Sequence, residues 1–371
     1  MPILPLFVAV STIAQAPSGA PPKVLFDFTP GPVTCEEGSP VAIAIERPVP
    51  AAGALTVSRP IADYVFTFRI DGAGRVGGIA LQPREVPNLY LPATDLQPAL
   101  AASRFAAGAP KSQCTIRYRV AAYPVAEAPV AIAQRFFVLP HDRVYFERDV
   151  TLRARDLGGN CYAGKAPTML LRGFPDLDSI PQPSGALSAT VAAFDIDRSG
   201  KPIRIRTITS DGNLMLDEAM RRAVAKSRYK PGDPRTGCSV PYFRRQPNPL
   251  TAPQIPPRDT FPASGEGCPA EDSRWAFLPT LTFPEPFRRR GVEGWAVVRY
   301  DYAPWGQVQN VTVLASEPAA AFGDQARQII GNARRTASPR GATGCIERVR
   351  FKMGKLGEMP DPAPPVPPPP F

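Results

Sequence analysis

The sequence predicts an α+β protein made of repeated small domains. Each is a short antiparallel sheet of β-β-α-β order with one face covered by a helix. The first observation behind this prediction is cysteine spacing, because the six cysteines fall into three pairs of nearly equal span. The pairs are Cys35 and Cys114, Cys161 and Cys238, and Cys268 and Cys345. The second observation is a glycine near each midpoint, at Gly74, Gly200 and Gly306. A fixed period of about 80 residues indicates a unit written three times.

The cysteines are expected to close each unit with its own disulfide. Among the possible connectivities, the repeat favours 35–114, 161–238 and 268–345. A unit of this size has only a small apolar core, so a cross-link is especially useful to it. In the chain-entropy model such a bond contributes roughly 4 kcal/mol of stability. Disulfides also indicate an oxidising compartment.

Each unit begins with a predicted β-hairpin. Alternating residues at 65–70, 191–196 and 296–300 run into tight turns that end at the midpoint glycines. In the first two units aspartate opens the turn, at Asp71 and Asp197, and glycine closes it, which fits a type I turn. Second strands follow, at 203–208 in the middle unit and 308–314 in the last.

A helix and a final strand complete each unit. Apolar residues recur at helical spacing at 216–224 and 322–333, whereas the first unit offers only Leu96, Leu100 and Phe105, with Pro98 near the start. The first helix is therefore predicted to be shorter. Strands are predicted after the second cysteine of each pair, at 115–118, 239–243 and 349–351.

The chain outside the units has recognisable segments. An apolar run at 3–13 is followed by Ala14-Gln15-Ala16, which is typical of a cleaved signal peptide. Strand-like stretches at 131–139 and 143–153 indicate a folded connector. Twelve C-terminal residues include eight prolines and favour polyproline II. The predicted organisation is a signal peptide at 1–16, a linker at 17–34, a degenerate domain with extra strands at 35–150, a second domain at 151–245, a proline-rich linker at 246–267, a third domain at 268–355 and a proline-rich tail at 356–371.

The charge balance narrows the partners. The chain has 43 basic and 33 acidic residues, a net charge of +10. In a secreted, disulfide-bonded protein this charge favours anionic envelope polymers or acidic protein surfaces over nucleic acid. A basic surface with no specific target is the alternative. The predicted location is the periplasm, with membrane contact only if the N-terminal apolar segment stays uncleaved as a short anchor.

The sequence offers little for catalysis. The single histidine, His141, lies in a connector, and with all cysteines paired no metal-ligand set remains. Asp195 and Asp197 share one strand face, but a turn and a solvent-facing position explain them better than a catalytic pair. The glycines near Gly74 open no helix, so no phosphate loop is indicated. We expect no enzyme, no metal and no cofactor.

Two units carry a resemblance to a known family. The third has the run 283–298, and the middle one has 194–202, 209–219 and 228–231. These runs resemble the C-terminal domain of the TonB energy-transducer family, and the first unit keeps only the hairpin, a helix remnant and the cysteine spacing. The resemblance implies a non-enzymatic periplasmic domain. Such a domain binds an extended segment of an outer-membrane receptor by adding a strand to its sheet edge.

For this sequence, the resemblance implies that the last strand of each unit is the edge that receives the peptide. The implied peptide-binding residues are Val240, Tyr242, Phe243, Ile346, Arg348, Val349, Arg350 and Phe351. Arg348 and Arg350 are expected to meet an acidic partner, while Pro241 removes one ladder donor. Two alternatives stay open. In the first, these strands only complete the fold or pair with each other between units. In the second, the chain is a structural envelope protein that binds peptidoglycan or another anionic polymer.

The chain also departs from an energy transducer. Its N-terminal apolar segment is short, its proline-rich segment is C-terminal and the domain is repeated. Peptide binding is therefore a firmer expectation than transmission of the proton-motive force.

Overall fold

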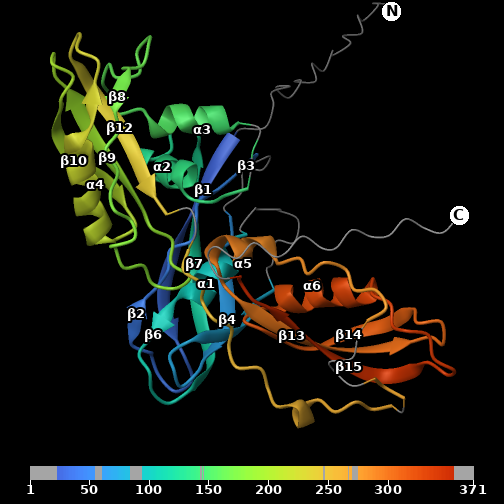
Figure 1. The fold of residues 1–371 in the computed structure, drawn as a ribbon. Coiled ribbons are helices and arrows are strands. Elements are labelled where there is room, and N and C mark those ends of the chain that lie inside the picture. The colour runs from blue at the N-terminus through green and yellow to red at the C-terminus, as the bar shows by residue number, and fades with distance from the viewer. Residues whose placement is uncertain are drawn as a thin grey trace, which may run out of the picture.

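The computed structural model describes residues 23–54, 61–83, 94–142, 144, 146–244, 247–265, 267–269 and 275–354. The predicted signal peptide and C-terminal tail lie outside these residues. No helix within the described ranges is both long and apolar enough to cross a bilayer. The fold is a mixture of helices and small antiparallel sheets (Figure 1).

The elements follow one another in a fixed chain order. They are β1 (Lys23–Thr34), β2 (Ala42–Ala44), β3 (Ala51–Ala54), β4 (Tyr64–Ile70), β5 (Val76–Leu81), α1 (Leu96–Ala102), β6 (Arg104–Phe105), β7 (Lys111–Pro124), α2 (Val130–Val138), α3 (Glu147–Ala154), β8 (Met169–Leu171), β9 (Ala189–Ile196), β10 (Pro202–Ser210), α4 (Leu214–Lys226), β11 (Arg228–Tyr229), β12 (Arg235–Phe243), η1 (Arg258–Thr260), α5 (Glu285–Arg290), β13 (Gly294–Tyr302), β14 (Val308–Glu317), α6 (Ala320–Gly331) and β15 (Ala342–Phe351).

The same sheet order recurs in three units. The first unit contains β4, β5, α1 and β7, the second β9, β10, α4 and β12, and the third β13, β14, α6 and β15. In each, the first hairpin strand is central, the second lies on one side and the last strand on the other. Alternate residues of the central strand pack beneath the helix; in β13 these are Ala296, Val298 and Tyr300. The predicted α+β class is confirmed.

The midpoint glycines explain how the hairpin meets the segment after the helix. Their φ angles are 77°, 81° and 85° for Gly74, Gly200 and Gly306. A Cβ on them would lie 2.0, 2.0 and 1.9 Å from the carbonyl oxygens of Phe105, Tyr229 and Arg335. The backbone N–H of each of those three residues donates to the glycine carbonyl. Only glycine combines this conformation with so close an approach.

The disulfides have the predicted pairing. Bonds join Cys35 to Cys114, Cys161 to Cys238, and Cys268 to Cys345. Each connects the chain ahead of a hairpin to the last strand of that unit. No described cysteine remains free.

The prediction of a linker at 17–34 was wrong for residues 23–34, which form β1. Val24, Leu25, Phe26 and Phe28 are buried, and β1 pairs antiparallel with β7 on one side and β3 on the other. Pro30 and Pro32 of this segment lie at a register shift between Pro30 and Val33. A bulge therefore absorbs them without ending the strand.

The connector after β7 is folded, but it is helical where strands were expected. The stretches at 131–139 and 143–153 form most of α2 and α3. Ile132, Ala133 and Phe136 recur at helical spacing and pack with Val150 of α3. Short apolar runs are ambiguous between strand and helix, and tertiary packing decided this one.

The first and third units share one hydrophobic core. Arg290 at the end of α5 is 1% exposed, and its guanidinium donates to both carboxylate oxygens of Asp95 at 2.7 Å. Burial alone lowers the pKa of Arg290, but the charge of Asp95 outweighs it and raises that pKa. A second contact joins Arg69 to Glu317 at 2.6 Å. The two units therefore pack as one body.

The second unit attaches through α2. The buried guanidinium of Arg135 donates to Asp211 at 2.9 Å and to the carbonyl of Pro48 at 3.3 Å. Thr209 of β10 donates to Gln134 of α2. Figure 1 shows this unit as a separate lobe above the other two.

The second face of the third sheet is covered by the chain between units. Ala252, Ile255 and Phe261 pack on Trp295 and its neighbours, and the Trp295 indole donates to the carbonyl of Pro253 at 2.9 Å. The proline-rich segment predicted as a linker at 246–267 thus lies along the sheet for part of its length.

Candidate peptide-binding edges

The outer edges of the last strands differ among the three units. In the first unit β1 lies along β7, with pairs that run from Thr34↔Thr115 to Val24↔Pro124. In the second and third units, within the described chain, no strand pairs with the outer side of β12 or β15. Equivalent edges are thus occupied in one unit and without a strand in two.

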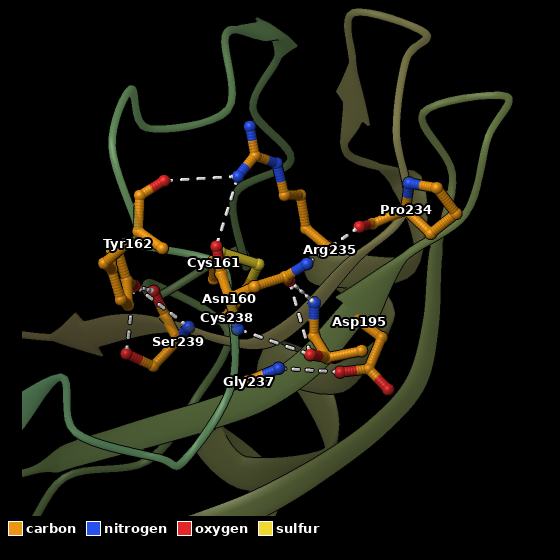
Figure 2. Close-up of a disulfide and its surroundings, with 11 residues drawn as sticks. Asn160, Cys161, Tyr162, Asp195, Pro234, Arg235, Gly237, Cys238 and Ser239 are labelled. Carbon is orange, nitrogen blue, oxygen red and sulfur yellow. Dashed lines mark hydrogen bonds between the residues drawn. A yellow bond between two sulfur atoms is a disulfide. The ribbon is translucent and has the colours of Figure 1, made fainter.

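A tyrosine hydroxyl closes the start of the β12 edge. Ser239 follows the disulfide residue Cys238, and its N–H donates to the Tyr162 hydroxyl at 3.0 Å (Figure 2). The same hydroxyl donates to the Ser239 carbonyl at 2.9 Å. Two residues on, Pro241 has no N–H and its carbonyl accepts from Arg172 at 3.5 Å. These contacts leave β12 a poor template for another strand.

The β15 edge has a different environment. Ladder hydrogen bonds alternate sides along an antiparallel strand, and Ile346 takes the place of Ser239 directly after its cysteine. The backbone groups of Ile346, Arg348 and Arg350 therefore face outward. Within the described residues, the chain before the unit contacts the backbone at the beginning of this edge, where the Ser264 N–H donates to the Gly344 carbonyl at 3.1 Å.

The side chains of the predicted binding residues divide into two sets. Those that point beneath the helices are buried core residues: Val240, Tyr242, Val349 and Phe351. Those on the opposite face are Phe243, Ile346, Arg348 and Arg350. Ile346 is buried under the segment that contains Ile255, and Phe243 packs near Val191. These side chains belong to sheet faces, so an added strand would meet mainly backbone.

The two arginines predicted to meet an acidic partner lie in different surroundings. Arg348 donates to the carbonyl oxygens of Pro256 at 2.5 Å and Pro257 at 2.9 Å. The Arg350 side chain is exposed. Of the two, Arg350 is the one directed to solvent.

An aspartate fixes the start of each of these two strands. Asp195 accepts from the Gly237 N–H at 2.8 Å and from Arg204 at 2.6 Å. Burial raises the pKa of Asp195, but these hydrogen bonds and the Arg204 charge outweigh it, so that pKa is lowered. Asp301 makes the equivalent contacts, to the Gly344 N–H at 2.7 Å and to Asn310 at 2.8 Å. Asp195 thus has a structural role.

Aromatic and charged groups hold β15 from the helix side. Arg335 donates to the Tyr300 hydroxyl at 2.8 Å and to Glu347 of β15 at 2.8 Å, and it stacks over the Trp275 ring at 3.5 Å. Burial raises the pKa of Tyr300 to about 12, against the opposing effect of Arg335. Trp305, in a turn, is exposed.

No metal centre was found in the described part of the chain, where no group of three or more His, Cys, Asp or Glu side chains could hold an ion. His141 lies close to the carbonyl of Leu139, with Nδ1 at 2.8 Å from that oxygen.

The geometry defines a class of small β-β-α-β domain whose last strand can have an outer edge without a strand partner. Residues 279–353, which include α5 and the strands and helix of the third unit, match the family described as the Gram-negative bacterial TonB protein C-terminal. This segment is a TonB C-terminal domain, as its resemblance predicted. No curated protein matches the chain. The family that this segment matches is non-enzymatic and is associated with envelope transport, an envelope or periplasmic location and outer-membrane receptors.

Sequence reasoning did not identify Tyr162 as part of this edge. Its only signal is its place after Cys161, which the disulfide holds close to the last strand. Aromatic residues next to a cross-link have many roles, so the signal has little specificity.

Proposed function

We propose that this chain is a non-enzymatic periplasmic protein that binds an extended peptide segment of an outer-membrane receptor by strand addition to β15. The main support for this proposal is that β1 pairs with β7, which is the strand of the first unit equivalent to β15. It indicates that the outer edge of a last strand in this fold accepts another strand. Main-chain hydrogen bonds would supply most of the affinity.

The third unit is favoured over the second as the receiving site. The β12 edge has a proline and a hydroxyl cap, whereas within the described residues β15 has no strand partner from Ile346 to Phe351. The family match also covers β15. The exposed Arg350 would favour a peptide with an acidic residue near that position.

The test uses the full chain, because the first and third units share a core. Synthetic peptides that cover the N-terminal periplasmic segments of outer-membrane receptors are titrated against it by calorimetry. Arg350→Pro removes an outward N–H, so we expect affinity to fall by about tenfold, the loss of one main-chain hydrogen bond of ~1.4 kcal/mol. Arg350→Gln keeps the N–H and should retain most of the affinity.

Hydrogen exchange locates the contact independently. Amides between Ile346 and Phe351 should become protected when the peptide binds. Absence of binding at millimolar peptide, or protection confined to another strand, would contradict the proposal. Salt-sensitive retention on purified cell-wall sacculi without peptide binding would instead favour the structural envelope role.

A further inference from the structure

A cavity of about 460 Å³ lies beside the outer edge of β12. Its walls come from the end of α2, the segment 161–172 and β12 itself, including Ser239 and Pro241. A larger hollow of about 1010 Å³ next to α3 shares Arg155, Tyr162 and Ala166 with it, so the two adjoin. Specific ligand sites commonly have volumes of roughly 300–1,000 Å³.

Two arginines in the cavity are held by aromatic rings. The Arg155 guanidinium lies 5.1 Å from the centre of the Tyr162 ring, and that of Arg172 lies 5.4 Å from the Tyr242 ring and 4.9 Å from the Phe174 ring. Stacking restricts the guanidinium plane while its N–H fork stays available to a carboxylate. These arginines therefore lose less freedom on binding than unsupported surface arginines.

Within the smaller cavity no described carboxylate opposes this charge. The adjoining hollow includes Asp149 and Asp156, but these pair with Lys23 and Arg153. In the described chain neither Arg155 nor Arg172 forms an ion pair, and the described residues that line the smaller cavity include no acidic side chain. The cavity is therefore complementary to an anion. Arg–carboxylate pairs with two parallel hydrogen bonds are among the strongest polar contacts available to it.

The remaining residues of the cavity wall indicate which class of ligand would bear the negative charge. Phe137 and Met169 are 39% and 41% exposed, which gives the cavity apolar flanks. The guanidinium groups cover one face of the Tyr162 and Tyr242 rings, so these rings offer a poor platform for a sugar. The backbone of β12 lies along one wall, but Tyr162 and Arg172 already contact its outward groups, so a peptide there would be held by its side chains. An extended chain with both acidic and apolar side chains fits these features.

We propose that this cavity binds an acidic, extended peptide segment of a protein partner, with its carboxylates on Arg155 and Arg172. The site lies between the end of α2 and the second unit and is separate from β15, so it does not depend on strand addition there. The disulfide between Cys161 and Cys238 connects two of its walls.

The experiment uses the full, oxidised chain and a short fluorescein-labelled peptide in which glutamate alternates with valine. Fluorescence anisotropy gives its affinity at low ionic strength and at about 0.15 M salt. We expect the double variant Arg155→Gln and Arg172→Gln to lose at least about tenfold in affinity, and the glutamine version of the peptide to lose a similar factor. The thermal midpoint of the double variant should stay near that of the parent.

Arg206→Gln is the matched control, because Arg206 is an exposed arginine on β10 at the opposite edge of the same sheet. Its affinity should remain within about twofold of the parent. An equal loss in this control, or equal binding of the glutamine peptide, would overturn the proposal. Binding of anionic cell-wall fragments without the peptide would also overturn it. Arg350→Pro should leave this affinity unchanged, which separates the site from β15.

Discussion

β7 and β15 are equivalent strands with different neighbours. β7 is paired along its outer edge with β1, whereas no described strand pairs with the outer edge of β15. The sheet order on their inner sides is the same. The difference lies in the flanking chain. Whether the outer edge of a last strand is paired is thus set by whether the chain before the unit supplies a strand.

β12 is an intermediate case. There a single hydroxyl, that of Tyr162, satisfies both outward groups of Ser239. The outer edge of the last strand therefore occurs in three states: paired with a full strand, capped by a side chain, and without a strand partner in the described residues. The following predictions test how much the filled edge, the start of the last strand and the hydroxyl cap contribute to stability.

The largest effect is expected where the strand fills the edge. Phe28 of β1 is 1% exposed and packs in the shared core. Phe28→Ala should lower the free energy of unfolding by about 3–5 kcal/mol, because it leaves a cavity and removes buried apolar area. Urea denaturation measures this loss. Thr29→Ala, at the exposed neighbouring position, should change stability by less than about 0.5 kcal/mol. Equal effects of the two would mean that β1 contributes only backbone pairing.

A smaller effect is expected at the start of β12. Asp195→Asn should cost about 1–2 kcal/mol at pH 7, because its charged hydrogen bonds are weakened. The pKa of Asp195 is lowered from its ordinary value of 3.8, so the stabilisation is present above that pH and is lost as the pH falls through the depressed pKa. Urea curves of parent and variant should therefore converge on acidification.

Asp301→Asn sharpens this comparison in the third unit. Asp301 accepts from the neutral Asn310 where Asp195 accepts from Arg204. We expect the smaller loss of stability in the Asp301 variant. If the difference in the free energy of unfolding between Asp195→Asn and the parent stays constant into strong acid, the charge of Asp195 makes no contribution to stability.

The smallest effect is expected for the hydroxyl cap. Tyr162→Phe should lower stability by about 1 kcal/mol, because Ser239 loses both outward partners but gains access to water. Hydrogen exchange at the Ser239 amide should become faster, while the equivalent amide of Ile346 should exchange as before. Unchanged exchange at Ser239 would rule out the cap.

The repeated parts of the fold were predictable from local signals. The cysteine spacing predicted the disulfides, and the turn glycines marked the hairpins at positions where a Cβ cannot fit. The periodicity at 216–224 and 322–333 predicted α4 and most of α6. These features depend on residues within one unit, which is why the sequence contains them.

The parts that depend on other units were not predictable in the same way. Nothing near Arg290 in the sequence indicates that Asp95 will neutralise it, because that contact joins two units. The residues of β1 were predicted as part of a linker, because the strand with which β1 pairs lies far along the chain. The candidate edges were predicted as strands, but which one is filled depends on chain outside the unit, and which one is capped depends on a tyrosine far from the strand in sequence.

The pairing of β1 with β7 also has a mechanical consequence. The hydrogen bonds of an antiparallel pair lie perpendicular to the strands, so a tension applied along β1 at Lys23 loads many of them in shear at the same time. Because the first and third units share a core, that tension would continue through Arg290 and Asp95 to the sheet that contains β15. A pull between Lys23 and a partner held on β15 would therefore meet resistance spread over a whole strand pair and a buried ion pair.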